Sequence, residues 1–449
     1  MQRSAKALDT IRWLSRKLKP NSDFVEKNMK IERKEATLLF IKTVVDSNEL
    51  QKLIIKPFFE MDSEAHYEAY LQSLPSQQEV TSRENLMIEL TKGSVLVAVS
   101  GQLLLFDVKK VNTNNILEAA IETTTQGPQY AFSEDIQTNV NLIRQRYHEP
   151  TLTVEMLEVG SKSHQALALI YDRETVSERM LDNIRQNLKE LKEPIIQSTV
   201  ELKRMMNKKK YALFPKMMVT ERTDRVVYNL SGGKIVILLD GDPFAIIAPC
   251  VFFDFLSAMD DNYYPYFVVK FLKGIRYLGM FLSLVLPGLY VAVTSYNPEI
   301  FRVQLAMSVA GSRVGVPYPS FVEVLFMLII MELLIEASVR LPKVISGTAT
   351  TVGGLILGTA ATEAALVSNI MIIIVSAVAI SNFAIPINEM NTAVRVMKYV
   401  LLAIATVSGV AGLTLGVVGL VMYLTHVNSF GEPYLKLFVQ KKANENEGI

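Results

Sequence analysis

The chain has 449 residues, of which 50% are hydrophobic and 20% charged, and its formal net charge is +1. Because there is neither an excess of positive charge nor a basic stripe, the composition argues against nucleic acid as a partner. The single cysteine, Cys250, excludes a disulfide within the chain and fits a reducing compartment.

Charged residues are frequent in the first part of the chain and sparse from Tyr277 to Asn428. We therefore expect an α/β N-terminal region of two similar subdomains, followed by an all-α polytopic membrane domain with four to five hydrophobic segments. The expected boundaries are 1–20 for a basic N-terminal extension, 21–125 and 126–265 for the two subdomains, 266–428 for the membrane domain and 429–449 for a C-terminal tail. Residues 1–20 lack an apolar core of signal-peptide length, so the N-terminal region is expected in the cytoplasm.

An internal repeat supports the two subdomains. Leu90 to Leu105 aligns with Leu230 to Ala245, and each segment reads as a glycine turn, an alternating strand and a second tight turn. Two strands and a helix are expected upstream of each copy, near 23–31, 36–45 and 48–55 and near 151–159, 165–171 and 176–191. Duplication of one α/β module accounts for this pattern, and the alternative is a chance similarity between two β-meanders.

No catalytic, cofactor or metal constellation emerges, so an enzyme is the least favoured class. The four histidines, His66, His148, His164 and His426, do not have the spacing of metal ligands. Three polar motifs have structural interpretations. We interpret 231–234 (SGGK) as a hairpin turn, 240–242 (DGD) as a turn, and 220–224 (TERTD) as a salt-bridged cap.

Four segments of the membrane domain have the length and apolar character of a span: 277–293, 319–339, 366–386 and 399–427. The last contains Gly409, Gly412, Gly416 and Gly419, whose spacing places them on one face of a continuous helix for close helix packing.

Residues 344–364 (VISGTATTVGGLILGTAATEA) are too polar for lipid and are expected to be short or re-entrant. If the segment is helical, small residues form one narrow face, namely Gly347, Thr351, Gly354, Gly358 and Thr362. One interpretation is close packing against another helix. The other is that this face, with Thr348, Thr359 and Glu363, borders water in an ion path.

Basic residues near the ends of the spans indicate their orientation. Lys270, Lys273 and Arg276 precede the first span, and Arg340 and Lys343 follow the second, which fits a cytoplasmic location for both. If 344–364 re-enters, the tail is cytoplasmic; if it crosses, the tail lies outside. We favour re-entry because the tail is basic.

The second span carries the three acidic residues Glu323, Glu332 and Glu336, which need partners or water, and Arg340 follows it. Glu332, Glu336 and Arg340 lie at i, i+4 and i+8 along one ridge, and Glu336 and Arg340 are in a favourable order for a salt bridge. Glu332 is assigned to a partner subunit or the pore. Glu323 lies about half a turn away, where it can reach headgroup water.

Several stretches together resemble the A subunit of the GerA-type spore-germination nutrient receptors. They are 214–249, 260–264 (DDNYY), 316–343, 353–369 and 429–435 (SFGEPYL), within a resemblance that covers about residues 21–435. The chain departs from the family at Val314, where an acidic residue is common, and at 125–128 (TQGP), where a basic-Gly-Pro element is common.

The resemblance implies a non-enzymatic subunit of a complex in the inner membrane of the bacterial spore. Its partners would be further A subunits in a homo-oligomer, a transporter-like B subunit, a lipoprotein C subunit, the lipid bilayer and monovalent cations. It implies a nutrient-gated cation channel that triggers germination. The alternatives are a non-conducting membrane transducer or scaffold subunit of the same receptor, and a secondary transporter, which the lack of an inverted repeat disfavours.

Overall fold

The computed structural model describes residues 2–31, 34–80, 82–110, 117–119, 121–122, 127–207 and 212–436. Residues 125 and 126 and the end of the expected tail, 437–449, lie outside these ranges. The chain divides into two compact units, and we describe each by itself. The N-terminal unit comprises Met1–Lys210 and Met217–Pro249, and the helical unit comprises Tyr211–Lys216 and Cys250–Ile449.

The first sheet of the N-terminal unit has five antiparallel strands in the order β1-β2-β4-β5-β3. Its strands are β1 (Phe24–Ile31), β2 (Lys34–Ile41), β3 (Gln77–Gln78), β4 (Ser94–Val99) and β5 (Gln102–Asp107). Its helices are α1 (Gln2–Leu18), α2 (Ser47–Leu50), a π-helical turn (Gln51–Ile55), α3 (Lys56–Glu60), α4 (Glu64–Ser73) and α5 (Arg83–Lys92).

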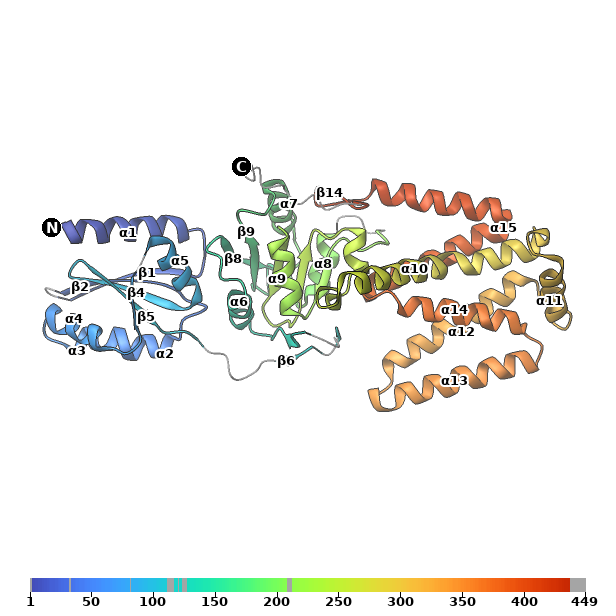
Figure 1. Ribbon diagram of the computed structural model, residues 1–449, viewed down its shortest axis with the longest axis horizontal. Helices are drawn as coiled ribbons and strands as arrows, with labels where there is room; N and C mark the ends of the chain where they lie inside the picture. Colours follow the sequence, from blue (N-terminus) through green and yellow to red (C-terminus); the bar gives the residue numbers. More distant parts are fainter. Residues whose placement is uncertain are drawn as a thin grey trace. The chain divides into compact units, whose positions relative to one another are not determined.

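The second sheet has the order β8-β9-β11-β12-β10 and is also antiparallel. Its strands are β8 (Leu152–Val159), β9 (Gln165–Asp172), β10 (Met218–Thr220), β11 (Ile235–Leu239) and β12 (Ala245–Ala248), with helices α6 (Ile136–Arg144), α7 (Glu178–Lys189), α8 (Thr199–Met206) and α9 (Thr223–Ser231). The pair β6 (Leu117–Glu118) and β7 (Tyr130–Ala131) lies between the two sheets in the sequence. Taken in chain order, the strands of the two sheets occupy equivalent positions, so the two sheets share one topology (Figure 1).

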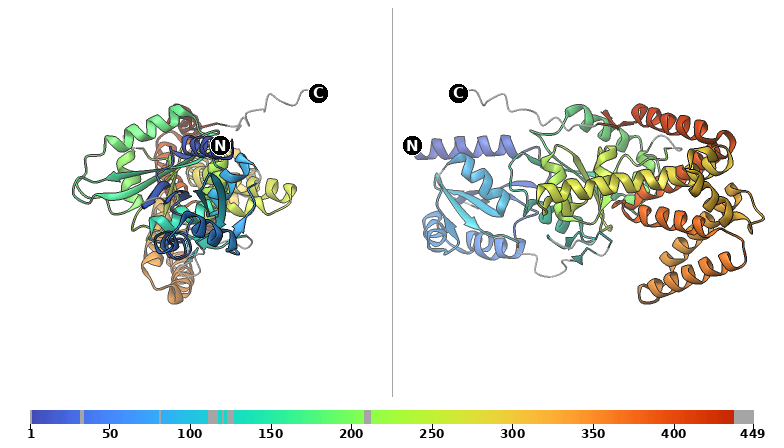
Figure 2. Two further views of the ribbon diagram at one scale, coloured as in Figure 1. Left: turned by 90° about the vertical axis from the view of Figure 1, so that its left-hand side faces the viewer. Right: turned by 45° about the vertical axis from the view of Figure 1, so that its right-hand side comes forward.

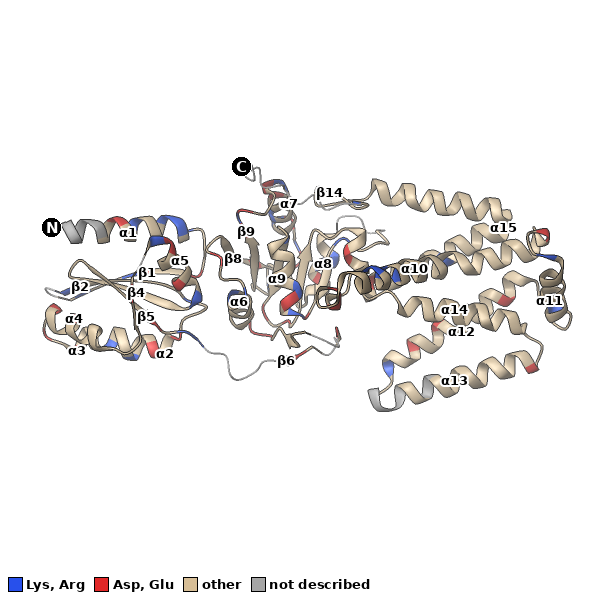
Figure 3. Ribbon diagram, in the orientation of Figure 1, with Lys and Arg blue, Asp and Glu red and all other residues tan. Residues whose placement is uncertain are grey.

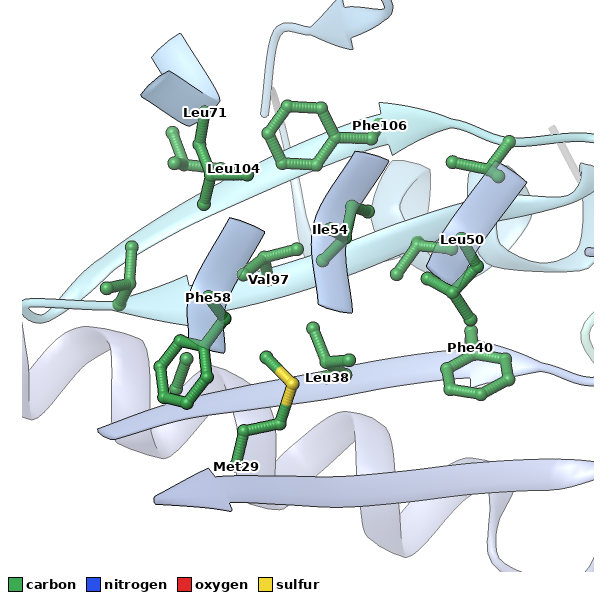
Figure 4. Packing of buried hydrophobic residues seen from close by; sticks show 14 of the residues in the cluster. Met29, Leu38, Phe40, Leu50, Ile54, Phe58, Leu71, Val97, Leu104 and Phe106 are labelled. Carbon is green, nitrogen blue, oxygen red and sulfur yellow. The ribbon is translucent and has the colours of Figure 1, made fainter. Parts of the chain in front are cut away.

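Strict alternation along the strands builds the core of the first sheet. Leu38, Val97 and Phe106 face the layer of α2 to α4, where Ile54 and Phe58 pack against them (Figure 4). The neighbouring strand residues 39, 96 and 105 are leucines that face α1 and α5 on the opposite side. Because side chains alternate between the faces of a strand, one run of apolar residues covers both faces of the sheet.

The expected N-terminal extension is a helix that belongs to this core. Ile11, Leu14 and Leu18 of α1 are buried against the sheet. Their i, i+3, i+7 spacing places them on one face, and the basic residues between them remain on the other side. The prediction of a separate extension, based on the positive charge of 1–20, is therefore wrong. The spacing of the apolar residues indicates instead that the helix packs against the sheet.

The helical unit contains the 3₁₀ turns Phe252–Leu256, Met259–Asn262 and Pro298–Ile300, and six α-helices. The helices are α10 (Tyr266–Ser295), α11 (Val303–Arg313), α12 (Ser320–Arg340), α13 (Lys343–Glu363), α14 (Asn369–Phe383) and α15 (Asn388–His426). By length and composition, α10 and α15 are apolar enough to cross a membrane, and α14 is apolar but shorter. Figure 3 shows how few charges this unit carries compared with the N-terminal unit.

Helix α15 is broken at Gly409 and folds back on itself. Gly409 has φ of 60° and ψ of −147°, a conformation that essentially only glycine adopts. Figure 2 shows the two halves of α15 running beside each other. The expectation that Gly409, Gly412, Gly416 and Gly419 share one face of a single helix is therefore wrong. Its 3, 4, 3 spacing assumed helical geometry through Gly409.

The segment expected to be short or re-entrant is continuous in the structure. Helix α13 has 21 residues, so it is about 31 Å long, comparable with the ~30 Å hydrocarbon core of a bilayer. The glycines and threonines within it did not interrupt it, because each leaves the backbone hydrogen-bond ladder of a helix intact.

The chain ends in a small hairpin, β13 (Asn428–Ser429) and β14 (Glu432–Pro433), which we call the C-terminal hairpin together with Tyr434 and Leu435.

Candidate functional site

A partly buried ionic contact in the helical unit joins α12 to α15. Glu332 accepts hydrogen bonds from both the Nε and an Nη of Arg395, the first at 2.9 Å, and from Lys398 Nζ at 3.0 Å. Lys398 is fully buried, whereas Glu332 and Arg395 are each 23% exposed. Two cations therefore face one carboxylate. Glu332 was expected to face a partner subunit or the pore. In the structure it pairs instead with two residues of the same chain.

A second polar cluster involves the other end of α12. Glu323 is buried, and its Oε1 accepts hydrogen bonds of 2.6 Å from both the backbone N–H and the hydroxyl of Ser368. Arg313 Nε lies 3.4 Å from Oε2, close enough for an ion pair but without hydrogen-bond alignment. The expectation that Glu323 reaches headgroup water is therefore wrong, because Ser368, the N-cap of α14, occupies that position.

The other predicted pair is present. Arg340 donates to Glu336 at 2.6 Å and 3.1 Å, and both side chains are exposed. An exposed pair at i, i+4 contributes only about 0.3–0.5 kcal/mol. The pair therefore lies at the end of α12 without fixing the helix to a neighbour.

The small-residue face of α13 does not pack within the chain. The principal neighbour of α13 is α12 (Figure 1). No atom within 4 Å would meet a Cβ at Gly347 or Gly354, and at Gly358 the nearest atom lies 4.0 Å away. Thr348 and Thr359 are exposed as well. Close packing of this face is thus not achieved by another described helix of the same chain.

Three threonine hydroxyls on α13 bond to the helix itself. Thr351 donates to the Gly347 carbonyl at 2.9 Å, Thr359 to the Leu355 carbonyl at 3.0 Å, and Thr362 to the Thr359 carbonyl at 2.8 Å. Each hydroxyl oxygen still offers lone pairs outward.

Glu363 is exposed but does not extend the small-residue face. In a continuous helix it lies about 140° from the centre of that face, since each residue turns by about 100°. Glu363 therefore marks the end of α13 on a different side from Gly354 and Gly358.

Two of the glycines after the break in α15 allow the second half of the helix to pack closely against the first half. A Cβ on Gly416 would lie 2.9 Å from Leu401 Cδ2 in the first half of α15, and one on Gly412 would lie 2.9 Å from the Ile404 carbonyl oxygen. At Gly409 a Cβ would meet the ring of Tyr296. Gly419 is in open space.

The C-terminal hairpin is fastened to the two segments that border the helical unit. The Tyr434 hydroxyl donates to the Pro215 carbonyl at 2.7 Å, and the Ser429 hydroxyl donates to the Lys216 carbonyl at 3.0 Å. The backbone N–H of Phe252 donates to the Tyr434 carbonyl at 3.0 Å. Burial raises the pKa of the Tyr434 phenol far above its ordinary value, so it donates as a neutral group.

The remaining motifs have structural roles. The interpretation of SGGK as a hairpin turn is wrong, because the motif joins helix α9 to strand β11 and Gly233 has φ of 79° there. In the DGD turn, Asp242 accepts from the N–H of Thr199 at the start of α8. Arg222 pairs with Asp224 as a salt-bridged cap. Among the described residues, no group of His, Cys, Asp or Glu side chains is arranged to hold a metal ion.

Sequence reasoning missed Arg313, Ser368, Arg395 and Lys398 as partners of the buried acids. A usable signal existed for two of them. After Lys343, the only cations before the tail are Arg395 and Lys398. A carboxylate as deep as Glu332 requires a counter-ion, so they were its nearest candidates.

Comparison with known proteins identifies the family. Residues 12–448 match the family described as Bacillus/Clostridium GerA spore germination protein. The chain belongs to this family. The resemblance inferred from the sequence motifs is thus confirmed.

Several curated proteins are similar to this GerA-family chain over most of its length. It is 32% identical to spore germination protein KA of Bacillus subtilis (strain 168), over 92% of this chain and 78% of that protein. It is 30% identical to the uncharacterized membrane protein YfkQ of the same organism, over 92% and 82%. It is 29% identical to spore germination protein GerQA of Bacillus cereus, over 98% and 89%.

A solved structure also matches the first part of the chain. It is the crystal structure of the N-terminal domain of the A subunit of the Bacillus megaterium spore germinant receptor GerK3. The match has a TM-score of 0.42 and 23% identity, and it covers 54% of this chain and 94% of that one.

Proposed function

We propose that this GerA-family protein is the A-type subunit of a nutrient-responsive germinant receptor in the inner membrane of the spore, and that several copies form a nutrient-gated cation channel. A transporter-like B subunit and a lipoprotein C subunit complete the receptor. Family membership supports the receptor role. The unpaired small-residue face of α13 is the observation that carries the channel role.

The proposed topology has six passages through the membrane: α10, α12, α13, α14 and the two halves of α15. The C-terminal hairpin supports an even number, since its hydrogen bonds to Pro215 and Phe252 place the end of α15 near the segments that lead into α10. Lys270, Lys273 and Arg340 then lie on the cytoplasmic side, as the excess of basic residues at cytoplasmic ends requires. The tail shares that side, and Glu363 lies at the outer end of α13.

Helix α13 supports an assembly of copies around an ion path. It contacts mainly α12, and its small-residue face carries outward-facing threonine oxygens. Repetition of this helix around a ring produces a lining of threonine hydroxyls, and Glu363 adds negative charge near the outer end of each helix, a combination that favours cations.

The test is cation flux through the receptor reconstituted with its B and C subunits in vesicles. We expect Glu363→Gln to reduce cation selectivity and Thr359→Trp to block flux. Glu299→Gln is the matched control, because Glu299 is another exposed carboxylate, outside α13. Normal flux and selectivity in both α13 variants, with normal assembly, would refute the pore assignment.

One observation favours a non-conducting transducer as the alternative. The threonine hydroxyls of α13 are satisfied by their own helix, so α13 does not require water on that face. A receptor that assembles and binds nutrient, but passes no cations in vesicles, would select this alternative.

A further inference from the structure

An apolar cavity that is partly open to the surface lies between α10, the two halves of α15 and the C-terminal hairpin. Its volume is about 210 Å³, and every side chain that lines it is apolar. The walls include Met280 and Leu284 of α10, Leu401 in the first half of α15, Val421 in the second, and Leu435 after the hairpin. Water is unstable in such a cavity because it finds no hydrogen-bond partner. Its natural occupant is hydrocarbon.

The wall formed by α10 continues into a basic surface. Met280 lies seven residues after Lys273 and Leu284 lies fourteen after Lys270, so each apolar residue is within about 40° of its lysine around the helix axis. Along the axis Lys273 precedes Met280 by about 10 Å. Figure 3 shows positions of Lys or Arg on the first part of α10.

The two lysines are available for an external anion. Neither has a carboxylate partner among the described residues, whereas the nearby Arg276 is bound to Asp261 at 2.6 Å. The Lys270 ammonium lies 5.1 Å from the centre of the Tyr266 ring and remains exposed. The positive charge of Lys270 and Lys273 is therefore not neutralised within the described chain.

The same end of α10 has the character of a helix at a membrane surface. Phe267 and Phe271 are 84% and 68% exposed, and Tyr266 beside them is exposed as well. Aromatic residues gather at the level of the lipid headgroups, where basic residues attract anionic lipid. Along α10, basic residues thus come first and the apolar wall of the cavity follows. A phospholipid has the same order, with its charged headgroup followed by its acyl chains.

We propose that an anionic phospholipid of the surrounding bilayer binds here, with its phosphate at Lys270 and Lys273 and one acyl chain in the cavity between α10 and α15. The chain would contact Phe252 and Leu435, which border Tyr434. Lipid occupancy then stabilises the attachment of the C-terminal hairpin. Lipid retention at this cavity is independent of ion conduction by the protein.

Mass spectrometry of phospholipid that remains bound to the purified full-length protein tests the proposal, after equilibration with vesicles of equal phosphatidylglycerol and phosphatidylcholine. We expect the wild type to retain phosphatidylglycerol selectively. Val421→Trp fills the cavity and should abolish retention, whereas Val418→Trp should not, because Val418 lies on the same half of α15 but does not line the cavity. Val417→Phe is a second, milder filling variant that tests the cavity if Val421→Trp does not fold.

The headgroup assignment has its own test. Lys270→Gln with Lys273→Gln should reduce the preference for phosphatidylglycerol by roughly 25-fold, at about fivefold for each basic residue near an anionic surface. Arg340→Gln is the control, because Arg340 is exposed at the end of a different helix. Retention that is unchanged in the filling variants overturns the acyl-chain site, and an unchanged lipid preference in the lysine variant overturns the headgroup site.

Discussion

Replacement of Glu332 by Gln should destabilise the helical unit more than any other single change to its charges. It leaves Arg395 and Lys398 facing each other without a carboxylate, and Lys398 is fully buried. Removal of one partner of a buried ion pair costs about 3–5 kcal/mol, since the remaining charge has lost its water as well as its partner. Arg395 is partly exposed and keeps some hydration, so Lys398 accounts for most of the cost.

The same geometry predicts a rescue. Lys398→Met alone leaves Glu332 paired with Arg395 in a one-to-one ion pair, so we expect a loss of less than about 1.5 kcal/mol, and Lys398→Met in the Glu332→Gln protein should recover most of the stability.

Thermal unfolding of the purified protein in detergent measures both effects. At about 2–4 °C per kcal/mol for a unit of this size, Glu332→Gln should lower the melting temperature by roughly 6–20 °C. Glu336→Gln is the matched control, because its pair with Arg340 is exposed, and it should change the melting temperature little. If Lys398→Met destabilises as much as Glu332→Gln, or fails to rescue it, the excess buried cation is not the cause.

Two further changes test the backbone of the helical unit. Gly409→Ala should cost at least about 2 kcal/mol, because alanine cannot adopt the backbone angles of Gly409 without strain and its Cβ would lie 2.9 Å from the Tyr296 ring. The control is Gly419→Ala, since Gly419 is in open space. Equal melting temperatures for the two variants would contradict the reversal of α15 at Gly409. Tyr434→Phe should cost about 1 kcal/mol by leaving the Pro215 carbonyl without its donor, and it should speed hydrogen exchange at the Phe252 amide, with unaltered exchange as the contrary result.

Local patterns were enough to predict the N-terminal unit. The aligned segments 90–105 and 230–245 occupy equivalent places, each running from the end of a helix through a glycine turn into two paired strands. Gly93 and Gly233, with φ of 112° and 79°, mark those turns. Such features are readable because turn chemistry and strand alternation depend on residues close in sequence. The position of α1 was not predicted, because its basic residues indicated a separate extension. The spacing of Ile11, Leu14 and Leu18 was the signal that the helix packs on the sheet.

The helical unit was less readable because apolar periodicity does not show where a helix reverses. The run from Tyr399 to Val427 has the hydropathy of one long span, but the single residue Gly409 divides it into two. In the proposed topology, that division changes the side of the membrane on which the tail lies. With α13 continuous and α15 reversed, a crossing by 344–364 and a cytoplasmic tail become compatible, although the sequence suggested that one excluded the other.

The partners of the buried acids were beyond local patterns. Ser368 lies 45 residues from Glu323 and Lys398 lies 66 from Glu332. A buried carboxylate indicates that a partner exists, but the identity of that partner depends on how the helices pack.

The attachment of the C-terminal hairpin has a consequence for biosynthesis. Tyr434 and Pro215 are 219 positions apart, so the ribosome completes the N-terminal unit and every helix before the partner of the Pro215 carbonyl exists. Domains generally fold in the order in which they are made. The hydrogen bonds that Tyr434 makes to Pro215 and Phe252, in contrast, form only after all the described helices have been synthesised, so a chain that stops short of Tyr434 would lack these bonds to the segments before α10.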